Sequence, residues 1–395
     1  MRNHSNRARL IEMEKRETPL SLNKGDNFYL NGLNNQFPAE VETVIINSPT
    51  AYKCAEITKK YLAGAGLADG YDDLIVDKQK NIKLSKFIRI ASKDIAYHGG
   101  VFIHVSYGID DAGDVVSKGM RVLDYSKCRI SKQDHNGNHS KVIYKDFSKN
   151  KSLLNSKKEN DTWFYFFNSD QKVILQQIKN DFKLRNNKKA EESDIIEMIR
   201  SYRGQVFYLN LTPEYIYSLP KIYSVYNDAD TEYRISLYNN KMSRTGFVGK
   251  TIIVKREGDE EEAEAFDEVA KNMLGVDNAD SLMIYEVENN VEDLTQALQV
   301  IQIKPQFDDK LFSETRSSIK QSIIDAYGVP ELLVSVQDNS LFGASAEAFK
   351  NAEIRFDNEL HFERMDLEDA IKMIGFDCKI KTLTENKNDT TNEIK

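Results

Sequence analysis

The stretch that decides the fold is residues 308–356, which read DDKLFSETRSSIKQSIIDAYGVPELLVSVQDNSLFGASAEAFKNAEIRF. Two aspartates at its start favour the positive N-terminal end of a helix, so we expect a helix over 308–327. Tyr327-Gly328-Val329-Pro330 predicts where that helix ends, because glycine commonly follows a helix and proline cannot continue one. A polar loop follows at 335–343, and then a longer helix begins. This order of elements is hard to explain as an enzyme pocket.

The helix predicted at 308–327 has one apolar stripe and one polar side. The stripe is narrow and contains Phe312, Ile319, Ile323 and Tyr327. The polar side carries Lys310, Glu314, Ser317 and Gln321. The next helix is expected to run unbroken from about Ser345 to Ile374, because that span has no glycine or proline, and could reach ~45 Å. Narrow stripes favour burial by neighbouring copies, although an ordinary monomeric bundle remains the alternative.

The composition describes an acidic protein with enough apolar residues for a core. The chain has 395 residues, of which 40% are hydrophobic, and a net charge of -8. This length suggests two or three compact units, because single cores rarely grow past ~250–300 residues. A tight DNA binder is normally basic, so this chain either avoids nucleic acid or lets it slide past.

The cysteines and the apolar runs indicate an intracellular protein. Cys54, Cys128 and Cys378 lie far apart and form no CxxC pair, so we expect small buried side chains rather than disulfides or a zinc site. No run approaches the ~18 apolar residues that a membrane span needs, and the start has no apolar h-region. The sequence therefore predicts synthesis in a cytoplasm without membrane insertion.

The first half of the chain predicts an α+β domain after a mixed-charge arm at 1–27, which either contacts a partner or frays. Helices are expected from Glu40, with a cap at Ser48-Pro49-Thr50 and an end at Gly64, and again over 83–97. Strands are expected at 101–105, 120–130 (as the partner of 101–105), 141–144, 163–167 and 206–211. A lysine-rich, helix-prone segment precedes the last strand and extends to about residue 202.

The second half begins with a helix signal at Thr212-Pro213-Glu214, a cap residue followed by proline. Pro220 should break or restart that helix, which then continues to about Lys241. Residues 245–306 read as a small insert between two helices, with strands at 251–255 and 282–287 and a helix at 265–274. The polar tail after Leu383 is expected to be disordered.

No motif predicts catalytic, metal or cofactor chemistry. None of the six histidines has the spacing of a helical zinc site, and GxSxG, Walker A and GxGxxG patterns are absent. Gly64-Ala65-Gly66 is similar to a phosphate loop, but it follows a helix, so we interpret it as a helix cap. Carboxylate pairs leave a metal-dependent nuclease as an alternative; these are Asp72-Asp73, Asp110-Asp111 and Asp308-Asp309.

Four stretches, taken in order, resemble the portal proteins (head-to-tail connectors) of tailed bacteriophages. They are NSPTAYKCAEITKKYLAGAGL at 47–67, LYNNKMSRTGFVGKTIIVK at 237–255, FDEVAKNMLGVDNADSLMIYEV at 266–287, and the opening stretch. The opening stretch matches the pattern helix, aromatic-Gly-Val-Pro-x-Leu-Leu, polar loop, long helix. Each motif is weak alone, but together the four span most of residues 47–375.

The resemblance implies an α+β portal-type subunit without catalytic residues, metals or cofactors. Its implied parts are a wing (28–211), stem helices (212–244 and 307–328), a clip (245–306), a channel loop (329–343), a kinked long helix (344–375) and a tail (376–395). The channel loop would present Gln337, Asp338, Asn339, Ser340, Leu341 and Phe342. Tyr327, Gly328, Val329 and Pro330 would join it to the stem.

The resemblance also implies partners and a location. It implies a homo-oligomeric ring, a dodecamer, at one vertex of a virion capsid, made in the cytoplasm of a bacterial host. Double-stranded DNA would pass through its channel during packaging and ejection. The terminase large subunit, a head-tail adaptor, and the major capsid and scaffold proteins would bind it. The short region after 375 puts a large crown in doubt, and few lysines at 308–327 put a basic ring there in doubt. Another phage head or tail adaptor protein is the remaining alternative.

Overall fold

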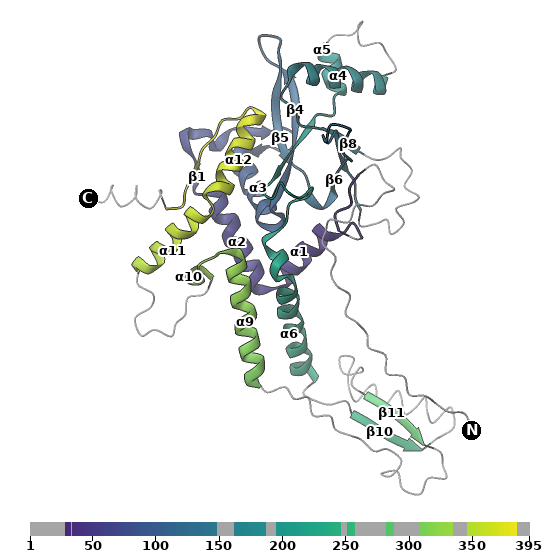
Figure 1. The fold of residues 1–395 in the computed structure, drawn as a ribbon, viewed down its shortest axis with the longest axis vertical. Helices are drawn as coiled ribbons and strands as arrows, with labels where there is room; N and C mark the ends of the chain where they lie inside the picture. The colour runs from purple at the N-terminus through teal and green to yellow at the C-terminus, as the bar shows by residue number, and fades with distance from the viewer. Residues whose placement is uncertain are drawn as a thin grey trace. The chain divides into compact units, whose positions relative to one another are not determined.

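Two compact units make up the chain (Figure 1). The first comprises Met1–Tyr226 and Ile323–Lys395, and the second comprises Asn227–Ser322. The computed structural model describes residues 28–32, 34–147, 162–186, 195–245, 251–256, 282–287, 309–334 and 346–384. None of the helices described combines the length and the apolar character that a bilayer crossing requires.

A six-stranded sheet forms the centre of the first unit, in the order β5-β4-β9-β8-β7-β6. Its strands are β4 Gly100–Ile109, β5 Val115–Val122, β6 Cys128–Ile130, β7 Lys141–Tyr144, β8 Thr162–Phe166 and β9 Gln205–Asn210. Only the β8–β9 pair among these is parallel. Phe102, Cys128, Val142 and Val206 have no exposed surface and lie in one apolar cluster. The predicted α+β class and the strands at 141–144, 163–167 and 206–211 are confirmed to within a residue or two.

The prediction that 120–130 is one strand beside 101–105 is confirmed only for residues 120–122, which pair with 103–105. Val115–Val122 is the partner of β4, and Cys128–Ile130 instead pairs with β7 at the far edge of the sheet. The chain turns between them because Asp124 accepts a hydrogen bond from the N–H of Ser126 and starts the 3-10 helix η2 Tyr125–Lys127. Tyr125 is buried in the apolar cluster, so the turn is held by packing as well.

Three helices pack together beside the sheet: α1 Phe37–Asn47, α2 Pro49–Ala63 and α3 Leu84–His98. The predicted cap is confirmed, since Ser48 Oγ accepts a hydrogen bond from the N–H of Ala51 and Pro49 occupies the first position of α2. Gly64 and Gly99 follow α2 and α3 with positive φ angles. Both predicted helix ends are therefore confirmed.

Shorter elements complete the first unit. They are β1 Gly66–Leu67 with β12 Ile380–Lys381, β2 Ile75–Asp77 with β3 Ile82–Lys83, the 3-10 helix η1 Ala68–Asp73, and the helices α4 Gln171–Asn186 and α5 Ile195–Ser201. The pair β1–β12 joins the C-terminal part of the chain to the end of α2. Helices α4 and α5 share an apolar cluster with Val115 of β5.

The predicted helix start at Thr212-Pro213-Glu214 is wrong. After β9 the side chains satisfy the backbone in a turn instead: Asn210 Oδ1 accepts from the N–H of Thr212, and Thr212 Oγ1 accepts from the N–H of Leu219. Tyr217 anchors this turn, because its ring is buried and its hydroxyl donates to the carbonyl of Tyr29. Helix begins only after Pro220, first as the 3-10 helix η5 Lys221–Val225 and then as α6 Tyr226–Thr245.

The prediction of one unbroken helix over 345–374 is also wrong. The chain forms α11 Ala346–Glu359 and α12 His361–Ile374, separated at Leu360. Arg364 Nη2 bonds to Asp357 Oδ1 across the break and to the carbonyl of Tyr61 on α2. These contacts and the complete burial of Leu360 account for a bend that no glycine or proline causes.

The second unit contains most of α6, the strands β10 Thr251–Arg256 and β11 Leu282–Val287, and the first part of α9 Asp309–Tyr327. Both predicted strands are confirmed, and they pair in parallel. The predicted helix at 265–274, the loop at 148–160, the arm at 1–27 and most of the tail after Leu383 lie outside the described residues.

Candidate functional site

The end of α9 is the candidate site, because the sequence predictions converge there. The N–H of Gly328 bonds to the carbonyl of Asp325 at 3.1 Å, and the N–H of Val329 bonds to that of Ile324 at 3.3 Å. This pair of bonds is a Schellman motif, in which the residue after the helix takes a left-handed conformation. Gly328 has φ 67°, as the motif requires. The predicted stop at Tyr327-Gly328-Val329-Pro330 is therefore confirmed in its backbone geometry.

Apolar packing holds this helix end in the first unit. Ile323, Ile324 and Val329 are each at most 3% exposed, which supplies the apolar contact that accompanies a Schellman motif. After Pro330 the chain makes the short helix α10 Glu331–Val334, which contacts both α2 and α11. The segment between α10 and α11 therefore leaves from one packed helix and returns to its neighbour.

Tyr327 is the most deeply inserted side chain of this junction. It is 1% exposed, and Cys54 of α2 and Tyr97 of α3 interact electrostatically with its hydroxyl. Burial raises the pKa of its hydroxyl well above the ordinary value. That hydroxyl has no hydrogen-bond partner among the described residues, so Tyr327 contributes through its ring rather than through its polar group.

The two faces predicted for α9 are confirmed where side chains are described. Ile319, Ile323 and Tyr327 are buried, while Glu314, Ser317 and Gln321 are exposed. The side chains of Lys310 and Phe312 lie outside the described residues. So do all six residues predicted for the loop: Gln337, Asp338, Asn339, Ser340, Leu341 and Phe342.

A buried ion pair next to the junction was not predicted. Arg364 and Asp357 are 4% exposed each, and Thr384 Oγ1 donates to the second carboxylate oxygen of Asp357 at 2.7 Å. The pair connects α11 and α12 and, through the carbonyl of Tyr61, reaches α2. Only the seven-residue spacing of Arg364 and Asp357, two helical turns, could have indicated it, and that spacing is common on solvated helix faces.

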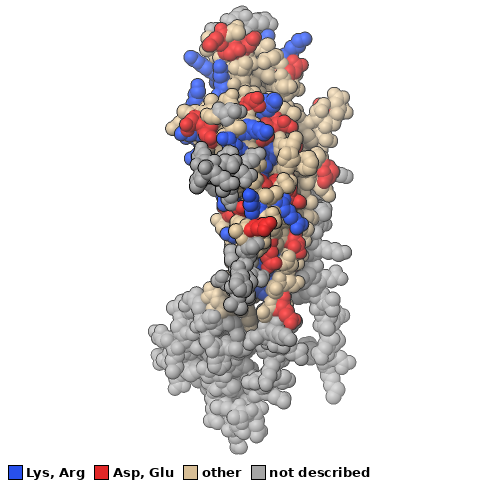
Figure 2. Space-filling model, turned by 90° about the vertical axis from the view of Figure 1, so that its left-hand side faces the viewer, with Lys and Arg blue, Asp and Glu red and all other residues tan. Residues whose placement is uncertain are grey.

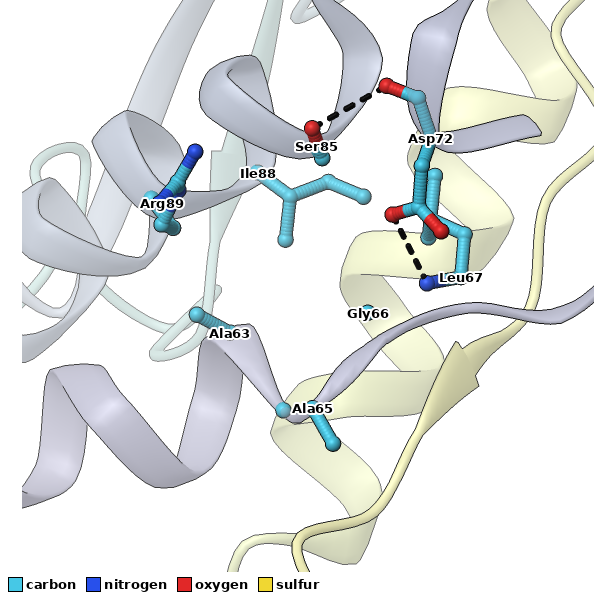
Figure 3. Close-up of a pocket in the computed structure, with 9 residues that line it drawn as sticks. Ala63, Ala65, Gly66, Leu67, Asp72, Ser85, Ile88 and Arg89 are labelled. Carbon is cyan, nitrogen blue, oxygen red and sulfur yellow. Dashed lines mark hydrogen bonds between the residues drawn. The ribbon is translucent and has the colours of Figure 1, made fainter. Parts of the chain in front are cut away.

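The Gly64-Ala65-Gly66 segment lines a pocket of about 260 Å³ (Figure 3). Two of its three amides are already used: the N–H of Gly64 donates to the carbonyl of Lys60, and that of Ala65 to the carbonyl of Lys381. Asp72 Oδ1 accepts from the N–H of Leu67 at 3.1 Å, which places a carboxylate inside the pocket. Arg89 of α3 lines the same pocket, so its charge is mixed. Gly64 ends α2 with φ 65° and with its N–H on the carbonyl of Lys60, so the interpretation as a helix cap is confirmed.

The histidines and acidic pairs form no catalytic cluster in the described chain. His98 and His104 are buried, and burial lowers the pKa of each. Asp73 pairs with Lys83, and Asp110 accepts backbone N–H groups in its own turn. No group of three potential metal ligands occurs among these residues. All three cysteines are buried and free, as predicted.

Comparisons with known proteins give structural likeness only. No family model and no curated protein matches the chain. The virion of a native gene transfer agent (GTA) particle contains a chain that matches with 12% identity and a TM-score of 0.49, covering 90% of this chain and 89% of that one. A native GTA neck computed with C12 symmetry matches with 12% identity and a TM-score of 0.48, over 90% and 89%.

A crystallised HK97 family phage portal protein from Corynebacterium diphtheriae matches with 10% identity and a TM-score of 0.40. That match covers 88% of this chain and 96% of the other. At these identities and scores the matches do not carry a functional argument, which therefore rests on the residues and elements described above.

Proposed function

We propose that the chain is the subunit of a portal ring, located at one vertex of a phage-type virion capsid. Double-stranded DNA passes through the ring during packaging and ejection. The observation that carries this proposal is the order of elements from α6 to α12. The helix α6 is followed by the strand pair β10–β11 and then by the helix α9, which ends in a Schellman motif. After α9 come the short helix α10, the segment that joins it to α11, and the bent pair of helices α11 and α12.

The resemblance predicted that same order from sequence, including the insert between two helices and the bend in the last helix. An enzyme alternative has no comparable support, because Asp73 is used in an ion pair with Lys83 and Asp110 in its own turn. Another head or tail adaptor protein remains the second candidate, since it shares the helices but does not require the loop.

The channel loop was expected at 329–343, but Glu331–Val334 form the helix α10. The segment between Val334 and Ala346 is therefore the proposed channel loop. Its two ends are fixed, because α10 and α11 pack on each other and α10 also packs on α2. A loop on such a base can contact a passing duplex without altering the packing beneath it. Gln337 to Phe342 are its proposed DNA-facing residues.

The surface charge fits a channel through which DNA slides without being held. The chain has a net charge of -8, and the face in Figure 2 mixes cations and anions without a broad basic field. Fewer neutralised phosphates mean weaker retention of DNA. The terminase large subunit, a head-tail adaptor, and the major capsid and scaffold proteins are the proposed partners of a dodecameric ring.

Deletion of residues 336–341 tests the loop assignment. The ring should still assemble, because α10 and α11 retain their packing, while DNA packaging or retention should fall. Ring mass by mass photometry and packaged DNA per particle are the two measurements. Loss of assembly would show that the segment is needed for the ring structure. Normal packaging would show that the loop does not act on the DNA.

A further inference from the structure

One face of α12 is exposed, apolar and acidic. Phe362 is 73% exposed, Met373 64% and Met365 42%. Asp366 and Asp369 are exposed on the same face, because residues three and four apart are neighbours on a helix. We call these five residues the acidic patch. Large apolar side chains this exposed indicate a surface that another molecule covers.

The charge of the acidic patch is not balanced within its own helix. Asp366 and Asp369 form no ion pair among the described residues, and Lys372, one turn further on, bonds to neither. Burial first, and then the like charges of Glu363 and Asp369, raise the pKa of Asp366. A partner that brings cations and apolar groups together would relieve this repulsion.

The same unit exposes a second patch with the opposite charge. Tyr71 of η1, Leu74 between η1 and β2, and Ile75 of β2 are 43%, 40% and 42% exposed. Lys78 and Lys80, in the turn between β2 and β3, are exposed and form no ion pair in the described chain. We call these five residues the basic patch. Asp77 Oδ1 accepts the N–H groups of Gln79 and Lys80, which fixes the turn that carries the lysines.

We propose that the acidic patch of one copy of this chain docks on the basic patch of a second copy. Each patch offers three exposed apolar side chains and two unpaired charges, so the two are complementary in kind and in number. Because the patches differ, the contact is heterologous, and a heterologous contact that closes generates a ring. This inference rests on the proposed portal ring and names the surfaces that join its subunits.

The C-terminal tail of the same chain fits the acidic patch poorly. The tail after Leu383 reads TENKNDTTNEIK and has one apolar residue, Ile394, so it cannot cover three exposed apolar side chains. Its two lysines are also accompanied by three carboxylates. A second copy is therefore a better occupant than this tail.

Charge reversal tests the pairing. D366K/D369K and K78E/K80E should each convert the ring to monomers, because like charges would then face each other across the contact. The combination of all four substitutions should restore the ring mass. Mass photometry measures assembly, and circular dichroism confirms that each variant is folded. The matched control is K179E/K183E, which reverses two exposed lysines of α4 outside both patches and should leave the ring intact.

The neutral variant D366N/D369N gives a second readout that keeps side-chain shape. It should raise the protein concentration needed for assembly, and it should reduce the sensitivity of assembly to salt. Rings from either single-patch reversal, or folded monomers from the fourfold variant, would overturn the pairing while the wild-type ring stands. Loss of assembly in the α4 control would assign the effect to net charge and overturn it as well. A monomeric wild type would instead overturn the proposed function itself.

Discussion

At the scale of single residues, the junction after α9 depends on Gly328, and the cost of replacing it can be compared with that of replacing Gly64. Gly328 has φ 67°, and an added Cβ would make only ordinary contact, 3.7 Å from the side chain of Glu359. Gly64 has φ 65°, but an added Cβ would overlap the carbonyl of Lys381 and lie 2.6 Å from Ile380 Cγ2.

Gly328→Ala should therefore lower the free energy of unfolding by about 1–2 kcal/mol, the cost of the left-handed backbone alone. Gly64→Ala should cost more, because backbone strain and overlap add. Urea denaturation of both variants measures the difference. Equal costs would mean that the end of α2 is not closed by β12 as described.

Two variants of Tyr327 distinguish the contribution of its ring to stability from that of its hydroxyl. The hydroxyl is buried without a hydrogen-bond partner among the described residues. Tyr327→Phe should be neutral or stabilising, because it removes an unsatisfied polar group. Tyr327→Ala should cost about 3–5 kcal/mol through the cavity that it leaves. A marked loss of unfolding free energy in Tyr327→Phe would show that the hydroxyl has a partner after all.

His104 makes stability depend on pH. The side chain is 8% exposed, and burial lowers its pKa from 6.5 to about 4. Between these values the unfolded chain binds a proton that the folded chain does not, so this contribution is present above pH 6.5 and is lost as pH falls towards about 4. The shift corresponds to about 3 kcal/mol.

His104→Gln should reduce the pH dependence of the urea midpoint between pH 6.5 and about 4, because the variant has no group to protonate there. The comparison with wild type isolates His104 from His98, whose pKa burial also lowers. Parallel midpoint curves for wild type and His104→Gln would contradict the assignment.

At the scale of elements, the break between α11 and α12 is held by the buried pair Arg364–Asp357. Removing one partner leaves an uncompensated buried charge, so Arg364→Met and Asp357→Asn should each cost about 3–5 kcal/mol of unfolding free energy. The double variant should cost clearly less than the sum of the two. Urea unfolding of the wild type, the two single variants and the double variant measures the coupling energy of the pair. Additive costs would show that the pair does not hold the bend.

Local signals predicted the elements whose ends depend on local chemistry. The Ser48 cap, the stop after α3 and the Schellman end of α9 are all encoded within a few residues, and all were predicted correctly. The strands at 141–144 and 251–256 were also recognisable from their β-branched and aromatic residues.

Elements that depend on distant partners were not predictable in this way. The bend at Leu360 requires Tyr61, some three hundred residues away, and the turn at Thr212 is held by the contact of Tyr217 with Tyr29. The place of β6 in the sheet depends on pairing with β7 rather than with its apparent neighbour. Of the candidate site, the junction was predicted residue by residue, while the ion pair that supports it was not.

At the scale of the whole molecule, the proposed assembly is a ring of copies of this chain around a channel. The acidic net charge and the two exposed apolar patches of opposite charge both acquire a role in such an assembly. The direct test is negative-stain imaging of the purified full-length protein, with its mass measured in solution. We predict rings with a central hole and a mass close to twelve subunits of 45.3 kDa. A monodisperse monomer at high protein concentration would contradict the claim.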